Sequence, residues 1–202
     1  MKTIFTSFFM LLTTFGLLAH GGGNYEHSDF FGSMQIGDKA AILMVHFGTT
    51  HDDTRTLTID VLNDRVKQQF PDLEVREAYT SRIVIKRLGD RSIIKADPLE
   101  VLQQLKSEGY THILIQSSTI IDGKEMESLE RNAAEVKDQF KEVRVGNPLL
   151  YDPDDYEAVI AAITKGADKN LAYVLVGHGT YDSTTAQYAM LDYMLKAKGH
   201  RS

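Results

Sequence analysis

The sequence predicts an α/β fold, with a parallel sheet and helices on its faces. From residue 40 onward, apolar runs typical of strands alternate with helical patterns, which is the order of elements in such folds. The first run, AAILMVHF (40–47), is continuously apolar, as expected for a strand buried on both faces. The chain of 202 residues has 43% hydrophobic and 25% charged residues, which is a globular composition.

Each expected strand ends in a loop that is polar or contains glycine. The five expected strands are residues 40–47, 73–79, 112–116, 143–146 and 172–176. In open parallel sheets, ligands bind beyond the carboxyl ends of the strands. We therefore expect function in the loops that follow them, at residues 46–53, 79–82, 117–125, 147–152 and 177–184.

Helical spacing fills the intervals between the strands. The clearest helix is expected over 122–140, where apolar residues recur at helical steps: Met126, Leu129, Ala133, Val136 and Phe140. The helix after the first strand has its expected apolar face at Leu57, Val61, Leu62, Val66 and Phe70. Asp-Pro pairs at 97–98 and 152–153 mark two helix starts, because Asp caps a helix and Pro suits its first position. A short helix over 83–88 and a last helix over 184–197 complete the pattern.

Residues 1–20 have the pattern of a secretory signal peptide. Lys2 precedes an uncharged stretch, 4–19, rich in Phe and Leu, and small residues follow it. This stretch is shorter than the roughly 20 apolar residues that a spanning helix needs. We therefore expect export to the periplasm with cleavage, no membrane attachment afterwards, and a glycine-rich flexible leader over 21–38.

The first and last expected strands resemble each other. AILMVHFGT (41–49) and AYVLVGHGT (172–180) both run from a strand into Gly-Thr and then a polar helix start. We interpret this as an internal duplication. The expected organisation is one lobe over 39–170 and the start of a second, incomplete lobe over 171–202, with an exposed apolar flank there.

Composition excludes several classes of protein. There are 22 basic and 28 acidic residues and no basic block, so we expect no nucleic-acid partner. The chain has no cysteine, which excludes thiol nucleophiles, cysteine zinc sites and iron–sulfur clusters. Neither glycine-rich nucleotide fingerprint is present, so we expect no nucleotide.

Two residues are the strongest candidates for chemistry. His178 lies between glycines in VGHG (176–179), at the end of an expected strand, where its ring can bind a metal or act as a base. The alternative is a histidine hydrogen-bonded within a tight turn. Glu125 opens the 122–140 helix, where the helix dipole favours a carboxylate. The alternative for Glu125 is a capping or solvated acid.

Weaker candidates lie in the other carboxyl-end loops. His46 and His51 would form a three-histidine cluster with His178 if adjacent strand ends share a pocket, but satisfied core or surface histidines are the alternative. Thr49, Tyr79 and Thr80 are the expected substrate contacts, and ordinary loop residues are the alternative for each.

Five strings occur together in the order found in one known family. They are VHFGTTHDDT (45–54), AYTS (78–81), IQSSTIIDGKE (115–125), VGNPLL (145–150) and VGHG (176–179). With these strings the chain resembles the anaerobic sirohydrochlorin cobaltochelatases of the CbiK type over about residues 40–198. The ordered set is specific, although each string alone is weak.

The resemblance implies a class II chelatase of two similar α/β lobes with the active site between them. Its reaction is insertion of Co²⁺ into the tetrapyrrole sirohydrochlorin without ATP, in cobalamin metabolism. By resemblance, His178 and Glu125 match the family's first active-site histidine and its active-site glutamate, which bind the metal and act in catalysis. Imidazole and carboxylate suit Co²⁺, with Fe²⁺ or Ni²⁺ as alternatives.

Three departures from the family pattern keep other functions open. The family's second active-site histidine lies beyond Ser202, Ser118-Thr119 replaces Leu-His, and His46 replaces a small residue. His46 or His51 would then be an additional ligand, or have no such role. An exported tetrapyrrole or metal carrier and an inactive truncated fragment are the alternative functions, and a homo-oligomer would rebuild a cleft from two copies.

Overall fold

The computed structural model describes residues 29–167 and 174–200. The chain divides into two units, 1–35 and 36–202, and every described helix and strand belongs to the second. In the first unit, the Gly32 amide closes a turn by donating to Asp29 Oδ1 at 2.7 Å. The predicted signal peptide lies outside the described residues. Among the helices of the described ranges, none combines the length and apolar character needed to cross a membrane.

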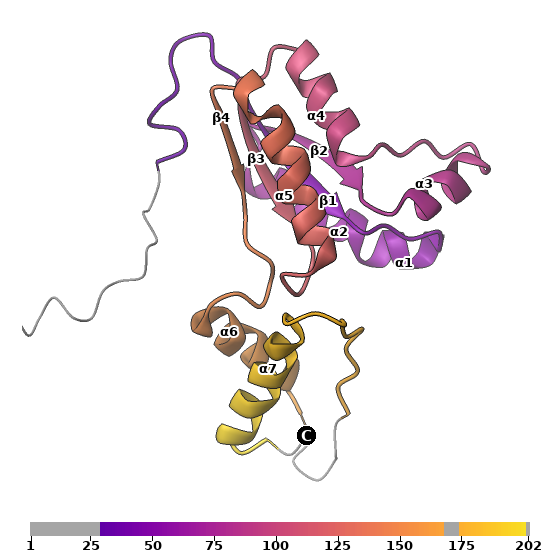
Figure 1. Ribbon diagram of the computed structural model, residues 1–202, viewed down its shortest axis with the longest axis vertical. Helices are drawn as coiled ribbons and strands as arrows, with labels where there is room; N and C mark the ends of the chain where they lie inside the picture. Colours follow the sequence, from indigo (N-terminus) through magenta and orange to yellow (C-terminus); the bar gives the residue numbers. More distant parts are fainter. Residues whose placement is uncertain (1–28, 168–173, 201–202) are drawn as a thin grey trace, which may run out of the picture. The chain divides into compact units, whose positions relative to one another are not determined.

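The second unit is built on a four-stranded parallel sheet (Figure 1). Its strands are β1 (Ala40–His46), β2 (Glu74–Tyr79), β3 (His112–Ser117) and β4 (Glu142–Val145), in the spatial order β2-β1-β3-β4. β1 lies between β2 and β3, with Val45 opposite both Ala78 and Ser117. The predicted fold class and the first four predicted strands are confirmed.

The described residues form seven α-helices. They are α1 (Asp52–Leu57), α2 (Ile59–Gln69), α3 (Arg82–Gly89), α4 (Pro98–Ser107), α5 (Lys124–Val136), α6 (Pro153–Thr164) and α7 (Thr185–Ala197). Of these, α1 to α5 lie between successive strands, and α6 and α7 follow β4. A 3₁₀ turn, Lys137–Gln139, extends α5. Asp97 and Asp152 cap α4 and α6 through complete capping boxes, which confirms both predicted starts.

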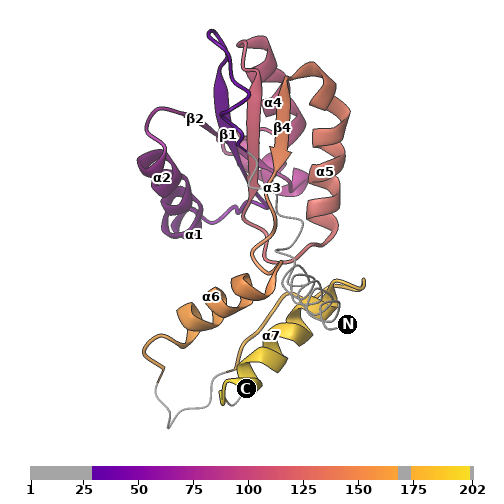
Figure 2. The ribbon, with the colours of Figure 1, turned by 90° about the vertical axis from the view of Figure 1, so that its left-hand side faces the viewer.

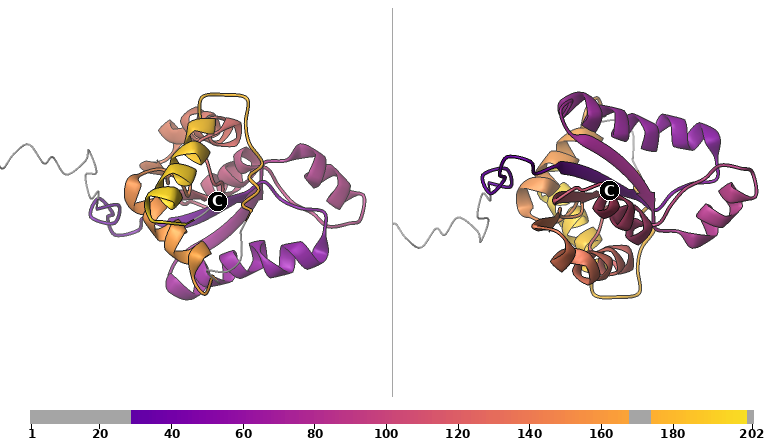
Figure 3. Two further views of the ribbon diagram at one scale, coloured as in Figure 1. Left: turned by 90° about the horizontal axis from the view of Figure 1, so that it is seen from below. Right: turned by 90° about the horizontal axis from the view of Figure 1, so that it is seen from above.

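The helices cover both faces of the sheet. α1 and α2 lie on one face, and α4 and α5 lie on the other (Figures 2 and 3). All of β1 is therefore buried, and its side chains alternate between the two sides. Leu43 and Val45 pack toward α4 and α5, whereas His46 points to the side of α2.

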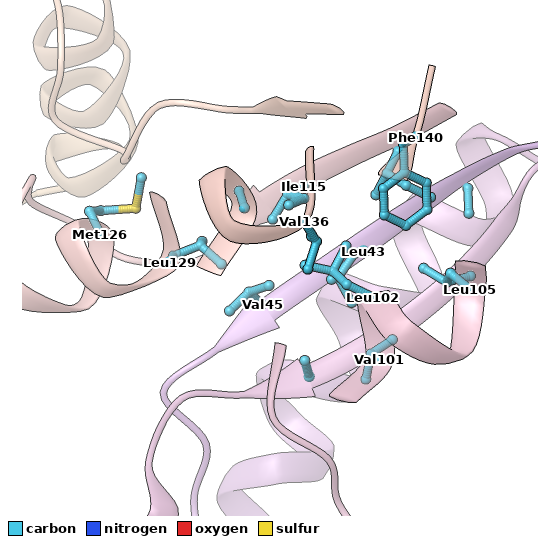
Figure 4. Close-up of a cluster of buried hydrophobic side chains, with 14 residues drawn as sticks. Leu43, Val45, Val101, Leu102, Leu105, Ile115, Met126, Leu129, Val136 and Phe140 are labelled. Carbon is cyan, nitrogen blue, oxygen red and sulfur yellow. The ribbon is translucent and has the colours of Figure 1, made fainter. Parts of the chain in front are cut away.

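The larger core lies between the sheet and α4 and α5 (Figure 4). The predicted apolar face of the 122–140 helix is confirmed, because Met126, Leu129, Ala133, Val136 and Phe140 all belong to this core. Leu102 and Leu105 of α4 fill the space between α5 and β2 and have no exposed surface.

The predicted apolar face of the helix after β1 is wrong. The helix breaks at Thr58, whose φ of −126° and ψ of −73° shift the helical phase between α1 and α2. α2 buries Ile59 and the polar Asn63 instead, and Leu57 and Leu62 are 75% and 41% exposed. The cause is a set of hydrogen bonds that hold Asn63 against the sheet, described below.

The fifth predicted strand is also not observed. Residues 172–173 lie outside the described ranges, and 174–176 form no strand, with Val174 and Val176 84% and 91% exposed. A strand requires a neighbour for its ladder of hydrogen bonds, and no described strand pairs with this segment. The expected exposed apolar flank is present in the described part of this region, and Tyr181 and Tyr193 add to it.

Leu102 is fully buried on α4, whereas Leu62 on α2 is partly exposed, and this contrast gives a first prediction. Leu102→Ala should lower the free energy of unfolding by about 2–5 kcal/mol, because it leaves a cavity in the larger core, between the sheet and α4 and α5. Leu62→Ala removes a partly exposed side chain and should cost under about 1 kcal/mol. Urea unfolding of the two variants measures both values. Equal losses would mean that the face of α2 bearing Leu62 is in fact packed.

Candidate functional site

The carboxyl ends of β1, β2 and β3 meet at one edge of the sheet, which we call the carboxyl edge. Backbone hydrogen bonds continue past the strand ends: Thr80 N donates to His46 O at 2.8 Å, and Ser118 N donates to Val45 O at 2.9 Å. The loops after the three strands therefore begin from fixed positions. Side chains from residues far apart in the sequence are held together there.

The loop after β1 is shaped by one glycine. Gly48 has a φ of +92°, and a Cβ on it would lie 2.4 Å from the Tyr79 ring. Glycine alone adopts this positive φ at low cost and also leaves room for the Tyr79 ring. The predicted substrate contact Thr49 follows directly, half-buried, and its Oγ1 accepts a hydrogen bond from the His51 amide at 3.2 Å.

His46 is the centre of a buried polar network. Its Nδ1 lies 2.8 Å from Ser118 Oγ, and its Nε2 lies 3.0 Å from Asn63 Oδ1. Asn63 Nδ2 donates to Glu77 Oε2 at 2.7 Å, and Glu77 is ion-paired with Lys95. Five side chains from five separate parts of the chain are thereby joined.

Burial controls the ionisation of His46. The side chain is 1% exposed, and this desolvation lowers its pKa below the ordinary 6.5, against the opposing effects of the Asn63 hydrogen bond and the Glu77 charge. The ring is therefore neutral at pH 7. A neutral imidazole has one protonated and one free nitrogen, and both are engaged here.

Tyr79 and Thr80 carry polar atoms that lack partners among the residues that the structure describes. Tyr79 Oη and Thr80 Oγ1 are buried and have no hydrogen-bond partner in the described ranges. The Tyr79 ring packs edge-to-face on His46, with centroids 6.4 Å apart, and Lys95 Nζ lies 5.0 Å from its centre. Burial raises the Tyr79 pKa, so the phenol keeps its proton at neutral pH. Both predicted contacts thus lie at the carboxyl edge, with Tyr79 beneath its surface.

Glu125 and His178 are both exposed. Glu125 lies in the first turn of α5, and His178 lies in the irregular segment before α7. No hydrogen bond from a described residue holds either side chain, so a tight-turn role for His178 and a capping role for Glu125 have no support among these residues. Their side chains are open to a ligand.

A hydrogen bond joins the loop before α5 to α7, the helix that follows the His178 segment. The Asp122 amide, three residues before Glu125, donates to Gln187 Oε1 in α7 at 2.8 Å. Asp182 has a lowered pKa, chiefly through the hydrogen bond from Thr184, with a smaller effect from the positive charge of Lys124. The loop before α5 and the segment before α7 therefore lie close together.

The conditional three-histidine cluster of His46, His51 and His178 does not form among the described residues. Within the described ranges, no three groups of the metal-binding type come together. His46 is buried, with both ring nitrogens hydrogen-bonded, which confirms its alternative as a satisfied core histidine. His51 is exposed at the start of α1.

Sequence reasoning missed the partners of His46. Asn63, Glu77 and Lys95 do not form a motif, because they are separated along the chain and meet only in the fold. One signal was present for Asn63: it follows Ile59 by one helical turn and therefore shares its buried face.

A parallel sheet with polar side chains gathered at its carboxyl edge defines a ligand-binding α/β protein. The family described as "Cobalt chelatase (CbiK)" matches residues 40–202, so the chain belongs to the cobalt chelatase family. This confirms the predicted family.

Two curated relatives are similar over 164 residues each. The sirohydrochlorin cobaltochelatase of Salmonella typhimurium is 34% identical, covering 79% of this chain and 62% of that protein. Sirohydrochlorin cobaltochelatase CbiKC of Nitratidesulfovibrio vulgaris is 32% identical, covering 78% of this chain and 58% of that protein. The chain spans about three-fifths of the length of these relatives.

The buried histidine predicts a dependence of stability on pH. Below pH 6.5 the unfolded chain protonates at His46 before the folded chain does, so the free energy of unfolding falls as pH decreases toward the folded-state pKa. This component has a slope of at most about 1.4 kcal/mol per pH unit. Urea unfolding between pH 5.5 and 8 measures it.

His46→Gln should remove the contribution of His46 to the change of the free energy of unfolding with pH. The exposed control, His51→Ala, should keep the wild-type pH dependence. An unchanged slope in His46→Gln would mean that the ring titrates equally in the folded and unfolded states.

Proposed function

We propose that this chain binds a tetrapyrrole at the carboxyl edge and inserts Co²⁺ into it, with sirohydrochlorin as the substrate. Membership in the cobalt chelatase family and the names of both relatives support the proposal. The observation that carries it is the Asp122–Gln187 hydrogen bond, which ties the loop before Glu125 to α7, the helix that follows the His178 segment. Glu125, His178, Thr49 and Thr80 keep their proposed roles. Tyr79 has no exposed surface, so it supports the site from below, where its ring packs against Gly48.

The proposed chemistry needs few groups. The His178 ring binds the incoming ion and accepts a proton from a pyrrole nitrogen, and the Glu125 carboxylate helps to hold the ion and balance its charge. One divalent ion replaces two N–H protons, so the net charge of the macrocycle does not change. No nucleotide is needed in this scheme.

The donor set suits a borderline divalent metal. Imidazole with carboxylate suits Co²⁺, and also Fe²⁺ and Ni²⁺. We propose Co²⁺ as the physiological substrate, because the family description and both relatives name cobalt. Export to the periplasm after cleavage of residues 1–20 remains part of this proposal.

The exposed apolar residues favour a second candidate function. Val174, Val176 and Tyr181 are largely exposed beside His178. Apolar surface of this kind suits a tetrapyrrole face or a second copy of the chain. A carrier that binds the tetrapyrrole without inserting metal, alone or as a homo-oligomer, is therefore the alternative.

Metal insertion by the full chain tests the proposal. Sirohydrochlorin and Co²⁺ are mixed with the protein, and the absorbance change on metallation is followed. His178→Ala should reduce the protein-dependent rate to background and leave the melting temperature unchanged, because no described residue hydrogen-bonds to its ring. Glu125→Gln should lower the rate by about 10²-fold or more, a typical loss for a group that stabilises developing charge.

His200→Ala is the matched control and should keep the wild-type rate. Full activity in His178→Ala would contradict the assignment of this residue. Tight binding of sirohydrochlorin by the wild type without metallation would favour the carrier.

A further inference from the structure

The pair formed by Ser118 and His46 joins the surface to the core. Ser118 lies just past the end of β3 and is exposed, whereas His46 at the end of β1 is buried. Ser118 Oγ is 2.8 Å from His46 Nδ1. Ser118 also begins the loop that leads to Glu125, so its hydroxyl lies at the carboxyl edge where the substrate is proposed to bind.

The direction of each hydrogen bond follows from the donors and acceptors present. The Asn63 amide nitrogen donates to Glu77, which leaves Asn63 Oδ1 to accept. His46 Nε2 must therefore carry the proton that it gives to Oδ1, at 3.0 Å. In a neutral ring Nδ1 is then free, and it accepts the hydroxyl proton of Ser118.

Three charged side chains, Glu77, Lys95 and Asp60, act on the His46 ring. Glu77 on β2 accepts from Asn63 and pairs with Lys95, which anchors the inner end of the network. Asp60 on α2 adds a negative field at the ring, and the Tyr79 ring packs against it. The negative charges of Glu77 and Asp60 favour an added proton on His46, whereas burial and Lys95 oppose one. Burial has the larger effect, so the pKa of His46 is lowered and the ring offers an unprotonated Nδ1 to Ser118 at neutral pH.

We propose that Ser118 and His46 form a proton relay for metal insertion, in which Ser118 contacts the tetrapyrrole and His46 accepts the proton through it. When the bound metal ion acidifies a pyrrole N–H, that proton passes to Ser118 Oγ while the Ser118 hydroxyl proton passes to His46 Nδ1. The N–metal bond takes the electron pair of the broken N–H bond. The reverse path returns the proton to water.

This relay rests on the proposed function, and it assigns one of the two displaced protons to His46. The other proton goes to His178, as proposed above. Ser118 is thus a catalytic residue by contact, and His46 acts only through it.

The first test needs no chelatase activity. ¹⁵N NMR of the imidazoles in the full chain should show His46 neutral at pH 7, with its proton on Nε2. Ser118→Ala should shift the Nδ1 resonance and leave the Nε2 proton in place. A proton on Nδ1 would overturn the relay, because Ser118 would then be the acceptor. This result stands whether or not the chain inserts cobalt, so it separates the relay from the proposed function.

The second test uses the rate of cobalt insertion. Ser118→Ala should lower the rate roughly 100-fold, at the lower end of the range of general acid–base effects, and Ser118→Thr should restore most of it because the hydroxyl returns. In the wild type, the rate should fall with decreasing pH below 6.5 as His46 becomes protonated, and Ser118→Ala should lose this part of the profile.

Ser107→Ala removes an exposed hydroxyl at the end of α4 and should change neither the rate nor the profile. An unchanged rate and pH profile in Ser118→Ala would overturn the relay. Absence of cobalt insertion by the wild type would overturn both the proposed function and the use of the relay in it, whatever tautomer NMR finds.

Discussion

The pairing of β1 with β2 on one side and β3 on the other is the constraint on which the rest of the structure depends. The register places His46 opposite Tyr79, and Val45 opposite Ser117. It therefore sets where three loops begin and which side chains meet at the carboxyl edge. Because β1 is buried on both faces, a shift of one residue would move His46 into the apolar core of α4 and α5 and is strongly disfavoured.

The hydrogen-bonded network around His46 explains two features of the structure. It accounts for the unexpected buried face of α2, and it sets which polar groups meet at the carboxyl edge. An unpaired polar side chain in the core costs several kcal/mol, so a buried histidine requires partners for both ring nitrogens. Asn63 and Ser118 meet that need, and Asn63 also bonds Glu77. Holding Asn63 against the sheet turns α2, which leaves Leu62 and its apolar neighbours partly exposed. The same network places the unprotonated Nδ1 of His46 in a hydrogen bond with the hydroxyl of Ser118, a residue exposed at the carboxyl edge.

The sequence predicted those features that local patterns control. The continuous apolar run of β1, the spacing of Met126 and Leu129 on α5, and the Asp-Pro caps depend on neighbouring residues, and all were predicted correctly. The face of α2 was not predictable, because it depends on a contact between Asn63 and a histidine on another element. The 174–176 segment has a strand pattern, but a strand also needs a partner, and composition does not supply one. The Ser118–His46 bond joins residues 72 positions apart and leaves no local signal.

Amide chemical shifts test most directly whether the tetrapyrrole binds at the carboxyl edge of the sheet, as we propose. Titration of the full chain with metal-free sirohydrochlorin should move the amide signals of residues 47–50, 80–82 and 118–125. The signals at the amino ends of the strands, residues 39–41 and 111–113, should stay in place. Shifts confined to the amino ends, or to the exposed face of α2, would contradict the placement of the site.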